Sequence, residues 1–349
     1  MSVDIGAADG GPALARPGRG DAVQIVDLDP SHLAEAARLY AAEFRRLRGA
    51  VPALPPGFLD PEMAEPLLRR AISAGPAVAA IRDGQLAGYM AGFPVPRLRG
   101  SGTGVHVPEW AHGATGGDRS EVYESLYTAI SARWAEAGWL CHCLSIFPGD
   151  PELGRALAWF GFGLFPVDAV RGLNPLGAAA PDGVKIDRAT PDDVDHLLPL
   201  AMGHDAYYCL APTFLIRDDT EDPREELARW IETPGESVWF SRLGSRALSF
   251  IYLRPPHDDV CQAVRHPGTI SIGGAFTVPD ARRTGVGTTL LSRVIEWASS
   301  AGFERLSVDF ETANVLARRF WLRAFDPICL SFERHLDDRL ARPRPESDR

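Results

Sequence analysis

A glycine- and arginine-bearing loop is the strongest chemical signal in the chain. Residues 282–287 read Arg-Arg-Thr-Gly-Val-Gly, after a β-rich run and before an amphipathic helix. The first N–H groups of a helix lack partners within it, and with the helix dipole they favour a bound anion. Gly285 and Gly287 let the backbone close on that anion without a β-carbon in the way. The pattern predicts a phosphate-binding loop, with Arg282 and Arg283 adding charge.

The same residues also fit an ordinary capped turn between a strand and a helix. Such a turn has the same glycines, so the bare pattern leaves that alternative open. A dinucleotide fingerprint is excluded because Leu290 stands at the place of its third glycine, and a P-loop would need Gly-Lys-Ser/Thr.

Two carboxylates follow the next predicted strand. Asp309 and Glu311 alternate with Val308 and Phe310, so they share the face opposite those apolar side chains. Partial burial would raise the pKa of either carboxyl toward that of a general base. Either carboxylate equally fits a cap for the helix expected to begin near Asn314.

The cysteines show no metal-binding spacing. Cys141 and Cys143 flank His142, but no second ligand pair stands at zinc spacing. We therefore expect no metal site, and interpret all five cysteines as thiols in a reducing cytoplasm.

The chain repeats itself at an offset of about 160 residues, which indicates duplication. The matching pairs of segments are 23–30 with 184–191, 78–93 with 238–253, 134–138 with 297–302, and 159–162 with 322–325. Each repeat reads strand, helices, hairpin, long strand, helix, strand, helix, strand. This order predicts an α/β (α+β) fold in which a mixed, mostly antiparallel sheet is flanked by helices.

Domain boundaries follow from the repeat and from composition. We predict two homologous domains at residues 21–174 and 184–341, joined by a Gly/Pro/Ala linker at 175–183. The segment 1–20 is predicted to be a disordered tail, and 342–349 a flexible one.

The second repeat resembles the GNAT acyltransferase superfamily. Arg282, Gly285 and Gly287 occupy the three places of its acyl-coenzyme A loop, Arg/Gln-x-x-Gly-x-Gly/Ala. Segment 306–310 looks like the family's fifth strand, and 314–321 looks like its Asn-x-x-Ala-x-x-Leu/Phe-Tyr helix. The resemblance covers the whole C-terminal repeat, and it implies an acyl-CoA site there.

The resemblance also implies particular contacts with the cofactor. Backbone groups that would pair with the pantetheine amides belong to Phe276, Thr277 and Val278. Backbone amides that would hold the pyrophosphate belong to Arg283, Thr284, Gly285, Val286, Gly287 and Thr288. Side chains placed along the cofactor arm are Asn314, Phe320 and Trp321, and for Trp321 packing in the core is the alternative. Asn314 fits equally well as a cap for its own helix.

The sequence departs from the family where proton transfer is concerned. Trp321 stands in place of the tyrosine that often serves as the acid, and an indole N–H does not release its proton at neutral pH. The fourth strand offers no carboxylate base, since its candidate positions are Ser271, Gly273 and Ala275. Asp309 and Glu311 therefore remain the candidate catalytic residues.

Two regions are less informative. His204, Tyr207 and Tyr208 lie in the helical region that shapes acceptor pockets in this superfamily, although a surface histidine and packed tyrosines account for them more simply. In the N-terminal repeat, residues 120–124 stand opposite the loop glycines, and Glu121 or Glu124 would repel a pyrophosphate. We interpret that repeat as a degenerate copy that serves as a scaffold.

These observations predict an N-acyltransferase that moves an acetyl or other acyl group from acetyl-CoA to an amine of a small molecule or protein. The alternative is a non-catalytic acyl-CoA sensor or scaffold. The two-repeat plan is also similar to that of mycothiol synthases, whose other motifs are not recognisable here. The acceptor amine is not predicted.

Composition bounds the partners and the compartment. The net charge of −10 argues against general nucleic-acid affinity. No run approaches the ~20 apolar residues of a membrane helix, and no signal peptide stands at the start. We expect a cytoplasmic monomer or homodimer.

Overall fold

The structure is a computed structural model that describes residues 23–98, 102–117, 119–216, 221–257 and 260–341. Both predicted tails, 1–20 and 342–349, lie outside the described residues. No helix among the described residues is long and apolar enough to cross a membrane.

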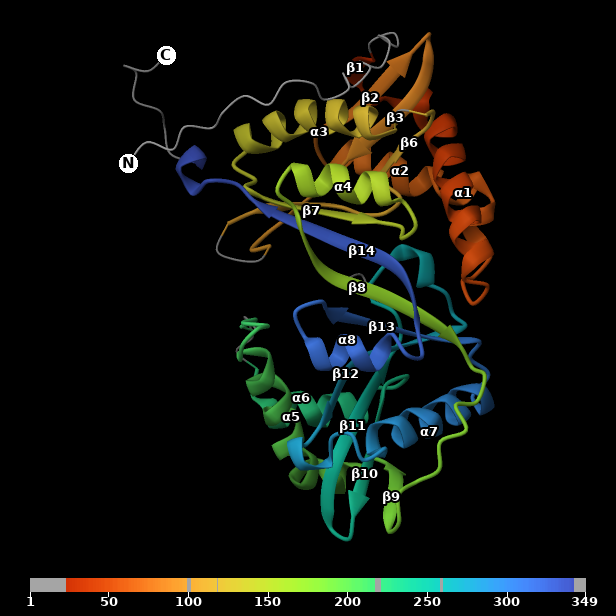
Figure 1. The fold of residues 1–349 in the computed structure, drawn as a ribbon, viewed down its shortest axis with the longest axis vertical. Helices are drawn as coiled ribbons and strands as arrows, with labels where there is room; N and C mark the ends of the chain where they lie inside the picture. The colour runs from red at the N-terminus through yellow and green to blue at the C-terminus, as the bar shows by residue number, and fades with distance from the viewer. Residues whose placement is uncertain (1–22, 99–101, 118, 217–220, 258–259, 342–349) are drawn as a thin grey trace, which may run out of the picture.

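The two halves of the chain follow the same order of elements (Figure 1). The first half contains β1 (Gln24–Asp27), α1 (Leu33–Ala50), α2 (Glu65–Ala74), β2 (Ala77–Arg82), β3 (Gln85–Ala91), β4 (Phe93–Val95), β5 (Gly104–Val107), β6 (His112–Ala114), α3 (Arg119–Glu136), β7 (Cys141–Ile146), α4 (Pro151–Trp159) and β8 (Gly163–Gly172). The second contains β9 (Val184–Arg188), α5 (Val194–Tyr208), α6 (Pro223–Glu232), β10 (Ser237–Leu243), β11 (Arg246–Arg254), β12 (Thr269–Thr277), α7 (Val286–Ser300), β13 (Arg305–Glu311), α8 (Val315–Trp321) and β14 (Asp326–His335). The long strand β12, which pairs with β11 and β13, stands where the first half has the short strands β6 and β5, which pair with β3 and β7.

The strands form two sheets of mixed direction. One has the order β1-β2-β3-β6, and the other has the order β4-β5-β7-β14-β8-β13-β12-β11-β10-β9. Only β5–β7 and β12–β13 pair in parallel among the described strands, and the other pairs are antiparallel. The predicted mixed, mostly antiparallel sheet is therefore present, but its larger part runs through both halves.

The two halves exchange their last strands. β8, from the first half, pairs with β13 of the second half, with Val167 opposite Phe310. β14, from the second half, pairs with β7 of the first, with Leu330 opposite Ile146. β8 and β14 pair with each other, and Figure 1 shows them side by side across the middle of the molecule. The repeat found in the sequence therefore does not form two sheets that are separate in space.

The cores follow this exchange. Val167 and Ala169 of β8 are buried with Leu290 and other residues of α7 in the core of the second half. Ile328 of β14 and Val264 of the β11–β12 loop are buried in the core of the first half. Burial of apolar side chains stabilises each half by roughly 25 cal/mol per Å². Each core thus contains side chains from the other half.

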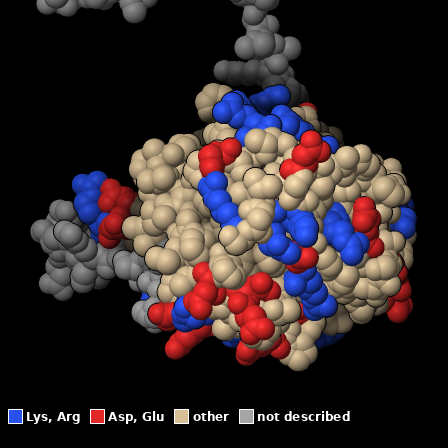
Figure 2. All heavy atoms as spheres, turned by 90° about the horizontal axis from the view of Figure 1, so that it is seen from below, with Lys and Arg blue, Asp and Glu red and all other residues tan. Residues whose placement is uncertain are grey.

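Helices cover both faces of the sheet in the second half, because successive side chains of its strands point to opposite faces and both faces are apolar. Val238 and Phe240 of β10 pack with residues of α5 and α6, while Trp239 between them packs toward α7. Figure 2 shows the whole molecule from below, and basic and acidic side chains are interspersed on that side of its surface. Ion pairs of the second half include Arg242 with Asp187, at 2.7 Å.

Candidate functional site

The site forms where β12 and β13 separate. The two strands pair in parallel only from Thr269–Ile272 on β12. An irregularity in the β11–β12 pairing follows at Gly273, a residue that often marks a bulge in a strand. Beyond it, β12 continues beside β11, while β13 continues beside β8 to Glu311. The facing edges of β12 and β13 are therefore not bonded to each other at this end.

Along β12, the peptide groups of successive residues point alternately toward β11 and toward this opening. The Val278 N–H donates to the Leu248 carbonyl at 2.9 Å, so Phe276 also turns its peptide groups toward β11. The Val278 carbonyl accepts from the Ala281 N–H at 3.0 Å. The peptide groups of Ala275 and Thr277 face the opposite way, toward the opening. The expected pantetheine contacts of Phe276 and Val278 do not fit this alternation, because the peptide groups of these residues already form hydrogen bonds with β11 and with the following loop.

The loop after β12 is built for an exposed helix N-terminus. Arg283 has a φ of 64°, and Gly285, the N-cap of α7, has a φ of 94°, which glycine adopts without strain. The Thr289 N–H donates to the Gly285 carbonyl at 2.9 Å. Over the described part of the chain, the backbone N–H groups from Arg283 to Thr288 have no protein acceptor. The amides that the sequence assigned to an anion are thus available for one.

The two loop arginines have different surroundings. Arg282 donates from Nε to the Thr277 carbonyl at 2.9 Å, and its guanidinium lies 5.0 Å from the Tyr207 ring and 5.4 Å from the Phe276 ring. This side chain joins α5 to the end of β12. Arg283 is exposed beside the open amides.

The predicted linker passes the same loop. The Thr289 hydroxyl donates to the Ala179 carbonyl at 3.0 Å. A β-carbon on Gly285 would lie 3.8 Å from the Pro181 ring. The linker therefore contacts one side of the loop.

The two predicted carboxylates lie at the end of β13 as expected. Val308 and Phe310 are buried, whereas Asp309 is exposed and Glu311 half-buried. The Glu311 carboxylate and the Asn314 side chain act on the pKa of the Tyr208 hydroxyl of α5, which places the three groups near one another. Burial, and then the neighbouring carboxylates, raise the pKa of Tyr208, so its phenol is protonated at neutral pH. The structure thus brings Tyr208 and Glu311 together.

His204 lies one helical turn before Tyr208 and completes the convergence. Their rings are 4.9 Å apart, and His204 Nδ1 is 3.1 Å from the Asp205 carboxylate. A β-carbon on Gly274 would lie 4.0 Å from the His204 ring. The sequence assigned these two residues to surface and packing, although their i, i+4 spacing already placed them on one face of a helix.

The family of this segment is decided by comparison with known proteins. Residues 204–326 match the model of the acetyltransferase (GNAT) family.

These residues form a GNAT-family domain.

Solved structures agree with this assignment at the level of the fold. The chain is similar to a GCN5-related N-acetyltransferase from Sphaerobacter thermophilus, with a TM-score of 0.56 and 12% identity, over 90% of this chain and 96% of that one. It is also similar to a GCN5-related glucosamine N-acetyltransferase region of a fungal multi-domain GH3 β-N-acetylglucosaminidase, with a TM-score of 0.51 and 12% identity, over 90% of this chain and 38% of that one. No curated protein matches the chain. The predicted α/β (α+β) fold class is confirmed, and the share of the chain covered is consistent with two GNAT-like domains.

Residues after β13 in the GNAT domain have distinct roles. The Asn314 side chain accepts from the Ala317 N–H at 3.1 Å and caps α8, so its capping role is observed. Phe320 faces Gly287, since a β-carbon there would lie 3.7 Å from its ring. Trp321 is 5% exposed and packs in the core, with its ring 5.5 Å from that of Phe325. Of the two positions expected for Trp321, the structure therefore has the one in the core.

The first half fills the corresponding space with side chains. Phe147 follows β7 and stacks on Tyr40 of α1 at 5.7 Å, whereas the GNAT domain has Glu311 at the end of β13. The segment Val260–Val264 of the second half packs into this core. Glu121 and Glu124 lie exposed on α3.

Proposed function

We propose that the protein is an N-acyltransferase that moves an acetyl or other acyl group from acetyl-CoA to an amine, in the GNAT domain of the second half. The observation that carries this proposal is the set of open amides from Arg283 to Thr288 beside the separated strands. A diphosphate fits such a helix N-terminus. The peptide groups of Ala275 and the N–H of Thr277, whose carbonyl already accepts from Arg282, fit the amides of an extended pantetheine arm.

Glu311 is the proposed general base. An amine acceptor reaches the site as an ammonium, and Glu311 takes its proton so that the free amine can attack the thioester carbon. Asp309, which is exposed on the same face, contributes negative charge that attracts the ammonium.

Tyr208 is the proposed acid for the leaving thiolate. When the tetrahedral intermediate collapses, the carbon–sulfur bond breaks and the sulfur takes the Tyr208 proton. The nitrogen, which still carries one proton more than the amide product, releases that proton to solvent. Tyr208 then recovers a proton from the neighbouring Glu311. Protonation of Glu311 removes one of the charges that raise the pKa of Tyr208, so proton uptake from the amine makes the phenol a better donor. In this assignment Tyr208 of α5 is the acid, a role that Trp321 cannot have because its indole does not release a proton at neutral pH.

The first half is proposed to be a scaffold without a second site. The support is the packing of Phe147, Tyr40 and the segment Val260–Val264 in the corresponding space. The Thr312 hydroxyl donates to the Leu164 carbonyl at 2.9 Å, so β8 of the first half also contacts the end of β13, where Glu311 lies.

The test is release of free CoA from acetyl-CoA with a panel of amines, compared between the native chain and Glu311→Gln. We expect a kcat lower by roughly 10²–10⁴, the usual contribution of a positioned base. The dissociation constant for CoA should be unchanged, because Glu311 lies away from the loop. Tyr208→Phe should lower kcat similarly, and Asp309→Asn should act mainly on KM for the amine.

Two outcomes would contradict the proposal in different ways. Tight CoA binding without thiol release for any amine would favour the non-catalytic sensor. Failure to bind CoA at all would remove the acyl-CoA site itself.

A further inference from the structure

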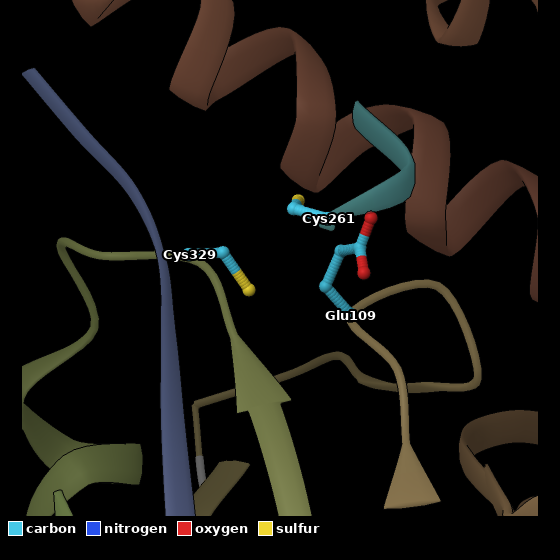
Figure 3. Close-up of side chains that lie close together, drawn as sticks. All are labelled: Glu109, Cys261 and Cys329. Carbon is cyan, nitrogen blue, oxygen red and sulfur yellow. The ribbon is translucent and has the colours of Figure 1, made fainter. Parts of the chain in front are cut away.

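A second cluster of reactive side chains lies outside the GNAT site. Among the described residues, Glu109, Cys261 and Cys329 each offer a ligand atom, and these atoms lie within 4.8 Å of one another. All three residues are buried, with exposures of 4%, 6% and 1%. Figure 3 shows the three side chains reaching into one space from separate segments.

The three segments are far apart in the sequence. Glu109 lies in the link between β5 and β6 of the first half. Cys261 lies in the β11–β12 loop, directly before the short 3₁₀ helix Gln262–Val264. Cys329 lies in β14, the strand that the second half inserts beside β7. The cluster therefore stands where the two halves interlock.

Neighbouring hydrogen bonds hold the cluster in place. The Ala263 N–H donates to Glu109 Oε1 at 3.1 Å, and the Cys261 N–H donates to Asp168 Oδ1 at 3.0 Å. Asp168 of β8 is the cross-strand partner of Cys329. The loop with Cys261 is thus fastened both to the Glu109 link and to the central strands, which positions the ligand atoms before any metal arrives.

The donor set fits zinc. Two thiolates and one carboxylate are typical ligands of Zn²⁺, which takes four ligands in a tetrahedron. Their three negative charges exceed the charge of the ion by one. Arg265 interacts electrostatically with Glu109 and supplies a compensating positive charge.

A buried hydroxyl points to a fourth ligand. Tyr40 is 1% exposed, and its hydroxyl has no hydrogen-bond partner among the described residues. The same hydroxyl interacts electrostatically with Glu109, Cys261 and Cys329. Buried polar groups are nearly always hydrogen-bonded. A water bound to the metal would pair with this phenol.

We propose that Glu109, Cys261 and Cys329 bind one Zn²⁺, with a water as the fourth ligand, and that this ion joins the two halves. On binding, each thiol loses its proton to solvent, and each sulfur forms one bond to the metal. No oxidant or reductant is needed. The site replaces our expectation from the sequence that the chain has no metal site, and it is independent of the proposed acyl transfer.

The test uses the full chain expressed in zinc-supplemented medium and purified under reducing conditions without chelator. Elemental analysis by mass spectrometry should find one zinc per chain. The chain expressed with Co²⁺ instead should show a thiolate-to-cobalt charge-transfer band of the intensity given by two thiolates. Loading during expression is needed because the site is buried.

Variants assign the ligands. Cys261→Ser and Cys329→Ser should each lower zinc content roughly tenfold or more, and Glu109→Gln should weaken retention against a chelator. Cys209→Ser, at an exposed cysteine, is the matched control and should keep the full zinc content.

The native protein alone can overturn the proposal, even where a ligand variant fails to fold. Absence of zinc and of the cobalt band after loading would do so. An intact mass lower by two hydrogens, with a Cys261–Cys329 disulfide found in peptides, would show a redox pair instead of a metal site.

Discussion

Single residues acquire their chemistry here from neighbours that the chain brings from elsewhere. His112 and His142 illustrate this in the first half. His142 lies 2.8 Å from the Tyr127 hydroxyl through Nδ1 and 3.0 Å from the Trp139 carbonyl through Nε2. His112 makes the same kind of pair with Tyr123 and the Ser145 carbonyl. A carbonyl can only accept, so each ring donates from Nε2, and in the neutral imidazole its Nδ1 accepts from the tyrosine hydroxyl.

These two histidines predict a loss of stability in mild acid. Burial lowers the pKa of His112 and of His142 from 6.5 to about 4. Below pH 6.5 the unfolded chain binds protons that the folded chain does not, so stability is present above that pH and falls as pH approaches 4. Between pH 7 and 5.5 each histidine should cost about 1 kcal/mol of the free energy of unfolding. Urea unfolding across this range measures it.

A histidine variant separates this effect from general acid sensitivity. His142→Gln should reduce the pH slope by the share of one histidine, whatever it does to stability at pH 7. His196→Gln is the control, because His196 is exposed. An unchanged slope in His142→Gln would contradict the assignment.

At the scale of elements, the site depends on how β12 ends and α7 begins. Gly287 lies in the first turn of α7, where a β-carbon would meet Thr277 Oγ1 at 3.5 Å and the Phe320 ring at 3.7 Å. Both are ordinary contact distances, so a side chain is tolerated by the helix. Larger atoms there would fill the space between the end of β12 and α8.

Gly287→Val is therefore expected to block CoA without unfolding the domain. The dissociation constant for CoA by calorimetry should rise at least about tenfold, which corresponds to about 1.4 kcal/mol. Gly154→Val in α4 is the matched control, since a β-carbon there meets nothing within 4 Å. Equal CoA affinity in both variants, with native circular dichroism, would argue against the loop as the diphosphate site.

At the scale of the whole molecule, the exchange of β8 and β14 makes the halves interdependent. β13 pairs with β8 along its full length, from Arg305 to Glu311. β14 has β7 and β8, both from the first half, as its two neighbours. A second half on its own would expose the edge of β13 and leave β14 without its sheet partners, and exposed strand edges favour aggregation.

Separate expression of the halves tests this dependence. Residues 178–349 alone should be aggregated or poorly structured by light scattering and circular dichroism. Co-expression with residues 1–177 should yield a soluble 1:1 complex that binds CoA, because the break lies in the linker. A folded monomer of residues 178–349 with native CoA affinity would contradict interdependence.

The sequence by itself determined the local features of this protein. Two of these features are read within one short segment: the glycines at 285 and 287, and the alternation of Val308 and Phe310 with the acidic residues. The third, the repeat at a near-constant offset, is found by matching one segment with another. They predicted the loop, the face of the carboxylates, the GNAT resemblance and the mixed sheet.

Only the tertiary structure decided which distant residues meet. Tyr208 reaches Glu311 because α5 packs beside β12, and the alternation along β12 turns Thr277 rather than Val278 to the opening. Trp321 enters the core, and Glu109, Cys261 and Cys329 converge because the halves exchange strands. Pattern within a segment reports its own periodicity and exposure. It does not determine which strand edge or loop of the other half will complete the hydrogen bonds of the segment. The strand exchange and the contacts that follow from it could therefore not be predicted from the sequence.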